Sequence, residues 1–143
     1  MRTLVICAVF SVLFAASAAI ESATAESSVK SLSATVASNV KSVVAKHWAG
    51  DKSCQAQHIV VSFTAPPANG TVTAQYEQMV VPAYASLGGA QGACAGRTVE
   101  GTVIYYQSKP GFSGQDSFRY LRTNVDNVQD RLNGEISYTV TVQ

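Results

Sequence analysis

Apolar and polar residues alternate along most of the chain from residue 54 onward, and turn residues separate the alternating runs. Alternation with a period of two is typical of half-buried β-strands. We expect strands over residues 58–63, 71–76, 79–84, 98–106, 116–123 and 136–142. Turn signals lie between them at residues 66–70 and at Asn133 and Gly134, a pair favoured in hairpins. Short strands at this spacing predict an all-β fold, an antiparallel sandwich over residues 54–143.

Residues 26–53 carry a second, mixed pattern. Six residues recur at intervals of three and four, as on one face of a helix: Val29, Leu32, Val36, Val40, Val43 and His47. Residues 31–36 also alternate with the period of a strand. Because an uninterrupted strand of about twenty residues would be unusual, length favours a short amphipathic helix that ends near Gly50. A partly ordered leader and a strand donated to another subunit are the alternatives.

The first 25 residues predict export. Arg2 precedes an apolar run over residues 4–16, which is too short for a stable transmembrane helix, and small residues follow. Residues 23–25, Ala-Thr-Ala, offer a cleavage site before Glu26, and residues 16–18, Ala-Ser-Ala, offer an earlier one. Residues 1–25 are interpreted as a secretory signal peptide. We therefore expect a periplasmic or secreted protein of one domain, with no membrane span after cleavage.

Two cysteines, Cys54 and Cys94, lie outside the predicted signal peptide. In an oxidising compartment a disulfide between them is the expected state. A reactive thiol or a metal site is disfavoured, because neither cysteine belongs to a Cys-x-x-Cys motif or has a neighbouring histidine. We expect the disulfide to contribute on the order of 4 kcal/mol to stability.

The charges are nearly balanced, with 10 Lys and Arg residues against 9 Asp and Glu residues. They form no basic cluster along the sequence, which excludes the electrostatic pattern of a nucleic-acid-binding protein. Trp48 is the one tryptophan, and we expect it in the core or in a lid.

The segment of residues 106–120 has the clearest turn between two strands. Pro110 and Gly111 suit the corner, and Gly114 supplies further backbone freedom. Phe112 is apolar in an otherwise polar turn, so we expect it to fold back onto the core. We expect the carboxylate of Asp116 to accept backbone N–H bonds in the Gly114 loop. Phe118 and Tyr120 continue the alternation of the next strand.

The order Pro-Gly-Phe-x-Gly-x-Asp-Ser-Phe-x-Tyr over residues 110–120 resembles a signature of bacterial cadherin-like and immunoglobulin-like β-sandwich modules. Residues 66–72 resemble an earlier Pro-x-x-Gly-x-Val segment of these modules, and residues 136–142 resemble their closing strand. The resemblance implies an exported, non-enzymatic binding or structural module, here in a single copy. Ser108 stands where the family usually has proline, and residues 124–127 lack its usual Asp-Gly-x-Gly turn, which weakens any transfer of calcium binding.

The sequence offers little catalytic chemistry. His47 and His58 are the only imidazoles, and neither lies in a catalytic motif. The carboxylates are scattered and form no recognisable acid–base pair. Asn124, Asp126 and Asp130 place oxygen atoms at a spacing that suits calcium, although a polar hairpin loop explains them equally well. We therefore expect no enzyme activity and no obligatory cofactor, with calcium as the one metal to test.

The expected function is binding at the cell envelope or outside the cell, with a protein or glycan partner. The contact surface would be the loops of residues 77–97 and 123–134, with Tyr76, Tyr84 and Tyr106 as aromatic contacts or core residues. The first alternative is an accessory domain of a carbohydrate-active enzyme or another hydrolase. The second is an assembly subunit that donates residues 26–48.

Overall fold

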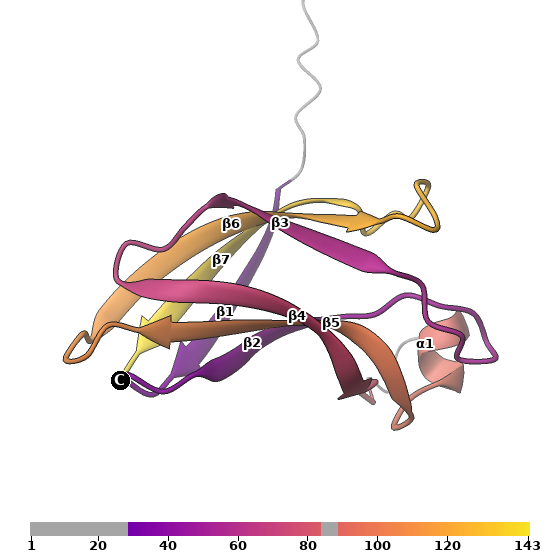
Figure 1. Ribbon diagram of the computed structural model, residues 1–143, viewed down its shortest axis with the longest axis horizontal. Helices are drawn as coiled ribbons and strands as arrows, with labels where there is room; N and C mark the ends of the chain where they lie inside the picture. Colours follow the sequence, from indigo (N-terminus) through magenta and orange to yellow (C-terminus); the bar gives the residue numbers. More distant parts are fainter. Residues whose placement is uncertain (1–28, 84–88) are drawn as a thin grey trace, which may run out of the picture.

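The structure, a computed structural model, describes residues 29–83 and 89–143, which form a β-sandwich of two sheets (Figure 1). This confirms the predicted all-β fold. The predicted signal peptide lies outside the described residues. The strands and one short helix are β1 Lys30–Val36, β2 Ser42–His47, β3 Ile59–Ala65, β4 Gly70–Val80, α1 Gly89–Ala93, β5 Thr98–Ser108, β6 Gly114–Asn124 and β7 Gly134–Val142.

One sheet has the strand order β1-β7-β6-β3 and the other has the order β2-β5-β4. All neighbouring strands are antiparallel except β1 and β7, which run parallel from the pair Lys30 and Ile136 to the pair Val36 and Val142. The first and last strands of the described chain are therefore hydrogen-bonded neighbours, with β1 at the edge of its sheet.

The helix predicted within residues 26–53 is wrong. These residues form β1 and β2, which pair with β7 and β5, so the sandwich begins at Lys30 and not at residue 54. A turn separates the two strands, and Asn39 adopts a left-handed backbone with φ of 59°. Asn tolerates this conformation better than most residues. The period-two alternation of residues 31–36 therefore indicated the structure correctly. The residues with helical spacing belong to two strands and the turn between them.

Two further elements differ from the sequence prediction. The strands expected over residues 71–76 and 79–84 are replaced by one strand of 11 residues, β4, which ends at Val80. Tyr84 lies outside the described residues. Part of the predicted contact loop of residues 77–97 forms α1, directly before Cys94. The closing hairpin connects β6 and β7 through residues 125–133, so its turn is longer than the predicted Asn133 and Gly134 pair.

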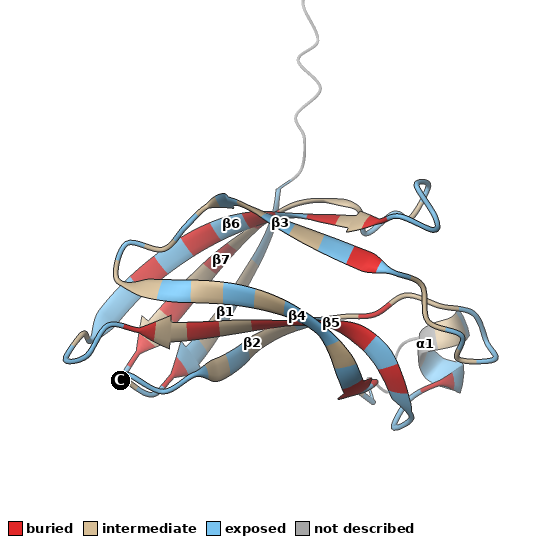
Figure 2. Cartoon of the chain, viewed as in Figure 1, coloured by how far each residue is buried: buried red, intermediate tan, exposed pale blue. Residues whose placement is uncertain are grey.

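The main core lies between the sheets, where alternate residues of β5, β6 and β7 point inward (Figure 2). Phe118 stacks on Tyr138 with ring centroids 5.1 Å apart, and Tyr106 is fully buried beside them. Phe112 packs against this cluster, which confirms its predicted role. A second cluster lies near α1 and consists of Trp48, Met79, Val81, Cys94, Val99 and Val103.

The buried carboxylate of Asp116 connects two loops and the core. It accepts hydrogen bonds from the backbone N–H groups of Ala68 at 3.1 Å and Asn69 at 2.8 Å, and from the Tyr106 hydroxyl at 3.0 Å. We expected this carboxylate to accept backbone N–H bonds in the Gly114 loop, and that location is wrong. The nearest bond of this kind comes from the N–H of Ser117, the next residue of β6. Its main partners lie in the turn before β4, which it ties to the start of β6.

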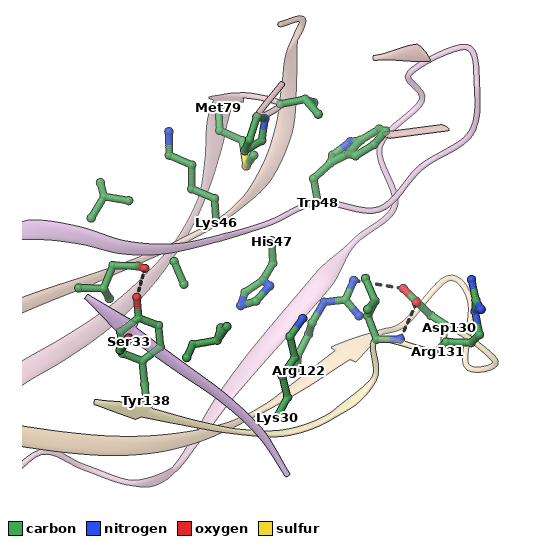
Figure 3. A pocket seen from close by; sticks show the side chains of 17 residues that line it. Lys30, Ser33, Lys46, His47, Trp48, Met79, Arg122, Asp130, Arg131 and Tyr138 are labelled. Atoms are coloured by element: carbon green, nitrogen blue, oxygen red, sulfur yellow. Dashed lines mark hydrogen bonds and ion pairs between the residues drawn. The ribbon is translucent and has the colours of Figure 1, made fainter. Parts of the chain in front are cut away.

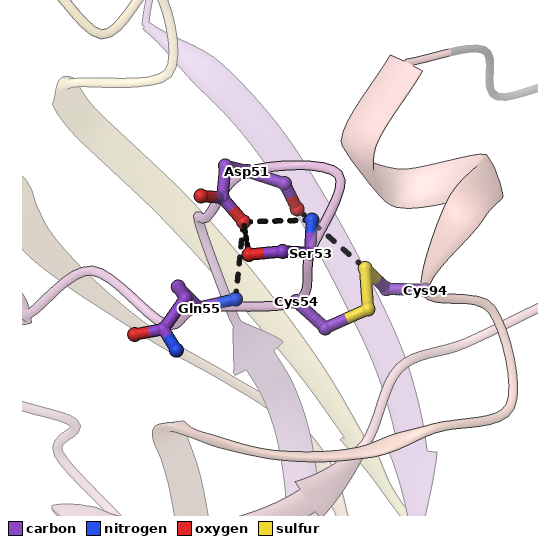
Figure 4. The surroundings of a disulfide bond; sticks show 5 residues. All are labelled: Asp51, Ser53, Cys54, Gln55 and Cys94. Atoms are coloured by element: carbon purple, nitrogen blue, oxygen red, sulfur yellow. Dashed lines mark hydrogen bonds between the residues drawn. A yellow bond between two sulfur atoms is a disulfide. The ribbon is translucent and has the colours of Figure 1, made fainter.

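The predicted disulfide between Cys54 and Cys94 is confirmed (Figure 4). It joins the turn after β2 to the end of α1. The Asp51 carboxylate shapes that turn by accepting hydrogen bonds from the hydroxyl of Ser53 and the backbone N–H groups of Ser53 and Gln55. These bonds lower the pKa of Asp51, the Ser53 side chain having the largest effect.

Candidate binding groove

A groove of about 1040 Å³ opens along the side of the sandwich where β1 and β2 are the edge strands of the two sheets. No described strand lies between these two edges. The end of β4 and the loop of residues 125–133 complete the walls together with single residues of β6 and β7. We call this feature the β1–β2 groove (Figure 3).

Strand β2 divides the groove. Figure 3 shows Lys46, Met79 and Trp48 on one side of this strand and His47 and Arg122 on the other. A bulge makes Val44 an extra residue, because the pairing with β5 shifts between Val43 and Ala45. The Tyr138 hydroxyl donates to the Val44 carbonyl and so ties this irregular stretch to the opposite sheet.

His47 faces the interior on the inner side of the groove. Its Nε2 atom lies 2.8 Å from the Tyr120 hydroxyl, within hydrogen-bond distance. Burial, together with the positive charges of Arg122 and Lys30, lowers the pKa of His47 to about 4. At neutral pH the imidazole is therefore uncharged, and it is a weak base because its proton would be repelled by two cations.

Arg122 is a charged residue at a core position, with 1% of its surface exposed. It donates to Asp130 at 3.1 Å and to Asn133 at 3.2 Å, while its Nε atom has no acceptor among the described residues. Burial opposes ionisation of Asp130. Hydrogen bonds from the Leu132 N–H and Asn124, with the charge of Arg122, nevertheless hold the pKa of Asp130 below its usual range.

The three calcium candidates have oxygen atoms that accept hydrogen bonds from the protein itself. The Asn124 amide nitrogen, and not its oxygen, faces Asp130 at 3.1 Å, and the oxygen accepts the backbone N–H groups of Asp126 and Asn127. The Asp126 carboxylate accepts the His58 N–H at 2.7 Å. The positive charge beside Asp130 is the Arg122 guanidinium. Across residues 29–83 and 89–143, no three His, Cys, Asp or Glu side chains are grouped as metal ligands.

The charges of the groove are unevenly distributed. Lys30, Lys46, Arg122 and Arg131 line it, against Asp130 as the one acidic residue of the lining. Lys30, Lys46 and Arg131 are exposed, so they present their charges to solvent at the rim. Because the whole chain has a formal charge of only +1, this concentration of cations is local. It favours a negatively charged occupant.

The rest of the lining is largely apolar. Leu32, Val44, Ala45 and Tyr138 form the inner wall, and Trp48 lies at the end of β2. Trp48 is 5% exposed, and its indole Nε1 has no acceptor in the described part of the chain. A groove with apolar walls and a few polar groups is the usual form of a small-molecule site.

The structure separates the aromatic residues that the sequence singled out. Tyr106 is fully buried, so it is a core residue and not a surface contact. Tyr76 is 45% exposed and lies beside His58 with ring centroids 4.7 Å apart, outside the groove. Tyr84 lies outside the described residues.

The two predicted contact loops contribute only part of the groove. Residues 79, 81 and 82 come from the first, and residues 130–132 come from the second. Lys30, Lys46 and Arg122 were missed by sequence reasoning. Only Arg122 could have been recognised in the sequence, because it continues the alternation of the inward-facing residues Phe118 and Tyr120.

Comparisons with family models, with curated proteins and with solved structures find no match for this chain. In the described ranges, no helix has the length and apolar character needed to cross a membrane.

Proposed function

We propose that this chain is an exported, non-enzymatic immunoglobulin-like module that binds a negatively charged ligand of the cell envelope or exterior in the β1–β2 groove. The observation that carries the proposal is the concentration of four basic residues around a largely apolar groove. Arg122 adds a buried guanidinium whose Nε atom has no acceptor among the described residues.

The strand order supports the resemblance to immunoglobulin-like modules. The orders β2-β5-β4 and β7-β6-β3 correspond to the B-E-D and G-F-C orders of such sandwiches. The disulfide between Cys54 and Cys94 supports export, since such bonds persist in oxidising compartments. Sites for catalysis are less well supported, because His47 is a weak base and Asp130 is paired with Arg122.

The two strands that lie within the segment proposed for donation are engaged within their own chain. β1 pairs with β7 over seven residue pairs, and β2 pairs with β5. Donation to another subunit would require both ladders to open. We therefore favour binding in the groove over assembly by strand donation.

Export is tested by expressing the full chain in a bacterial host, fractionating the cells and sequencing the N-terminus of the product. We expect a periplasmic or secreted product that begins near Glu26, the residue after the predicted cleavage site. A cytoplasmic product that retains residues 1–25 would contradict this part of the proposal.

Binding is tested by immobilising the exported chain and exposing it to envelope extract. The double variant Lys30→Glu/Arg131→Glu reverses two exposed charges of the rim, whereas Lys52→Glu reverses an exposed charge that does not line the groove. We expect the wild type and Lys52→Glu to retain the same anionic material and the double variant to lose it. Equal retention by all three proteins would refute a role for the groove.

A further inference from the structure

We propose that the ligand of the β1–β2 groove is an amphiphile, with one anionic head group at the cationic residues and an alkyl chain between the two edge strands. This inference rests on the proposed function and names the chemical class of the ligand. The head group can be a carboxylate or a phosphate, because both offer the negative charge and oxygen acceptors that these residues lack.

The head group is assigned to the mouth of the groove, at the exposed side chains of Lys30 and Arg131, with the buried charge of Arg122 behind them. Lys30 and Arg122 both line the groove on the side of β2 that holds His47 (Figure 3), so their charges act on the same region. Arg122 is 1% exposed and donates to Asp130 and Asn133, so it contributes its positive charge rather than a direct contact with the head group. Hydrogen bonds from a guanidinium, here that of Arg131, to an anionic oxygen are among the stronger ones in proteins.

The alkyl chain is assigned to the apolar inner wall. Leu32, Val44 and Ala45 are only partly buried at the margin of the main core, where β1 and β2 diverge from each other. Val43 is 46% exposed and Leu132 is 47% exposed, so apolar surface continues to the mouth of the groove. An alkyl chain placed there would cover this surface, which is the main source of affinity for apolar groups.

An acidic glycan fits this groove less well than an amphiphile. A sugar chain needs polar partners along its length, and the inner wall offers mainly aliphatic side chains. The aromatic rings of the groove, Trp48 and Tyr138, are 5% and 3% exposed, so neither presents an open ring face. Tyr76, the strongly exposed tyrosine among the described residues, does not line the groove.

The test uses dodecanoate and dodecyl phosphate below their micelle-forming concentrations, with dodecanol as the uncharged probe. Acetate and inorganic phosphate are the probes without a chain. Fluorescence of the one tryptophan, Trp48, reports binding because this residue lines the groove. We expect at least one charged amphiphile to bind about tenfold more tightly than dodecanol. We expect affinity to rise by about fourfold for each methylene added to shorter homologues.

Variants locate the site. Lys30→Glu/Arg131→Glu should weaken binding of the charged amphiphile by about tenfold or more, and Lys52→Glu should leave it unchanged. Arg122→Gln should weaken binding further, provided that this variant folds. If it does not fold, the variants at the exposed rim still test the site. Chemical-shift changes of Arg122 and His47 on titration should accompany the fluorescence change.

Each result decides the inference. If dodecanol binds as tightly as the charged amphiphiles, the requirement for an anionic head group is refuted. If acetate or phosphate binds as tightly as they do, the requirement for an alkyl chain is refuted. Failure of both amphiphiles, with groove-dependent material still retained from extract, would refute this inference and leave the proposed function standing. Failure of both experiments would refute the two together. Dodecanoate and dodecyl phosphate, compared directly, identify which head group the site prefers.

Discussion

Mild acid should destabilise the sandwich through His47. The imidazole is half-buried against the Tyr120 hydroxyl, and burial, Arg122 and Lys30 together lower its pKa to about 4. In the unfolded chain its pKa returns to 6.5. As the pH falls below 6.5, the unfolded state takes up a proton that the folded state cannot accept, so the equilibrium moves toward unfolding.

The size of this effect follows from the two pKa values. The full gap between about 4 and 6.5 corresponds to about 3 kcal/mol, lost progressively as the pH falls through this window. Between pH 7.5 and pH 5 the expected loss is about 2 kcal/mol. Asp130 does not contribute in this range, because its lowered pKa moves its own loss of stability to more acidic pH.

Urea unfolding followed by tryptophan fluorescence at pH 5, 6 and 7.5 measures the effect. His47→Gln keeps a polar group beside Tyr120 but cannot titrate, so its stability should change little across this range. His58→Gln is the matched control, since it removes the other histidine of the chain, which is exposed. If His47→Gln loses as much stability on acidification as the wild type, the assignment of the effect to His47 is refuted.

Four other variants test the fold by the same unfolding assay. Asp116→Ala should lower the free energy of unfolding by about 3 kcal/mol, because it leaves buried donors without an acceptor; a loss below about 1 kcal/mol would contradict this. Replacing Cys54 and Cys94 by serine should cost about 4 kcal/mol for a sequence separation of 40, and an unchanged Tm would be inconsistent with that role. Gly70→Ala should cost about 3 kcal/mol, because the new Cβ would lie 2.6 Å from an aromatic ring. Gly111 has φ of 77° and open space around it, so Gly111→Ala should cost only about 1 kcal/mol. A larger loss of stability for Gly111→Ala than for Gly70→Ala would contradict the packing argument.

The strands after residue 54 could be predicted because each carries its own signal. Alternation on β6 and the Pro110 and Gly111 turn are local features, and local features are what a single sequence displays. The N-terminal segment was predicted wrongly because its turn contains neither Gly nor Pro. Asn39 takes the left-handed conformation there, and the pairing with β7 comes from the far end of the chain.

The groove could be predicted only in part. Arg122 is recognisable as a charge in phase with buried aromatic residues of the same strand. Lys30 and Lys46 read as ordinary exposed lysines, and nothing local relates them to Arg122. They come together because β1 and β2 are the edges of two different sheets on the same side of the sandwich. That relation belongs to the strand order, which no single segment encodes.

The parallel pairing of β1 with β7 also sets the order in which the molecule can be completed. β1 is among the first parts of the sandwich to be synthesised, yet its hydrogen-bonding neighbour is the final strand. Until residues 134–142 have left the ribosome, β1 has no ladder and β6 lacks one of its two neighbours. An interrupted polypeptide would therefore expose two unprotected strand edges, a feature that promotes aggregation and removal by proteases. The geometry thus makes synthesis through β7 a condition for a closed, protected fold.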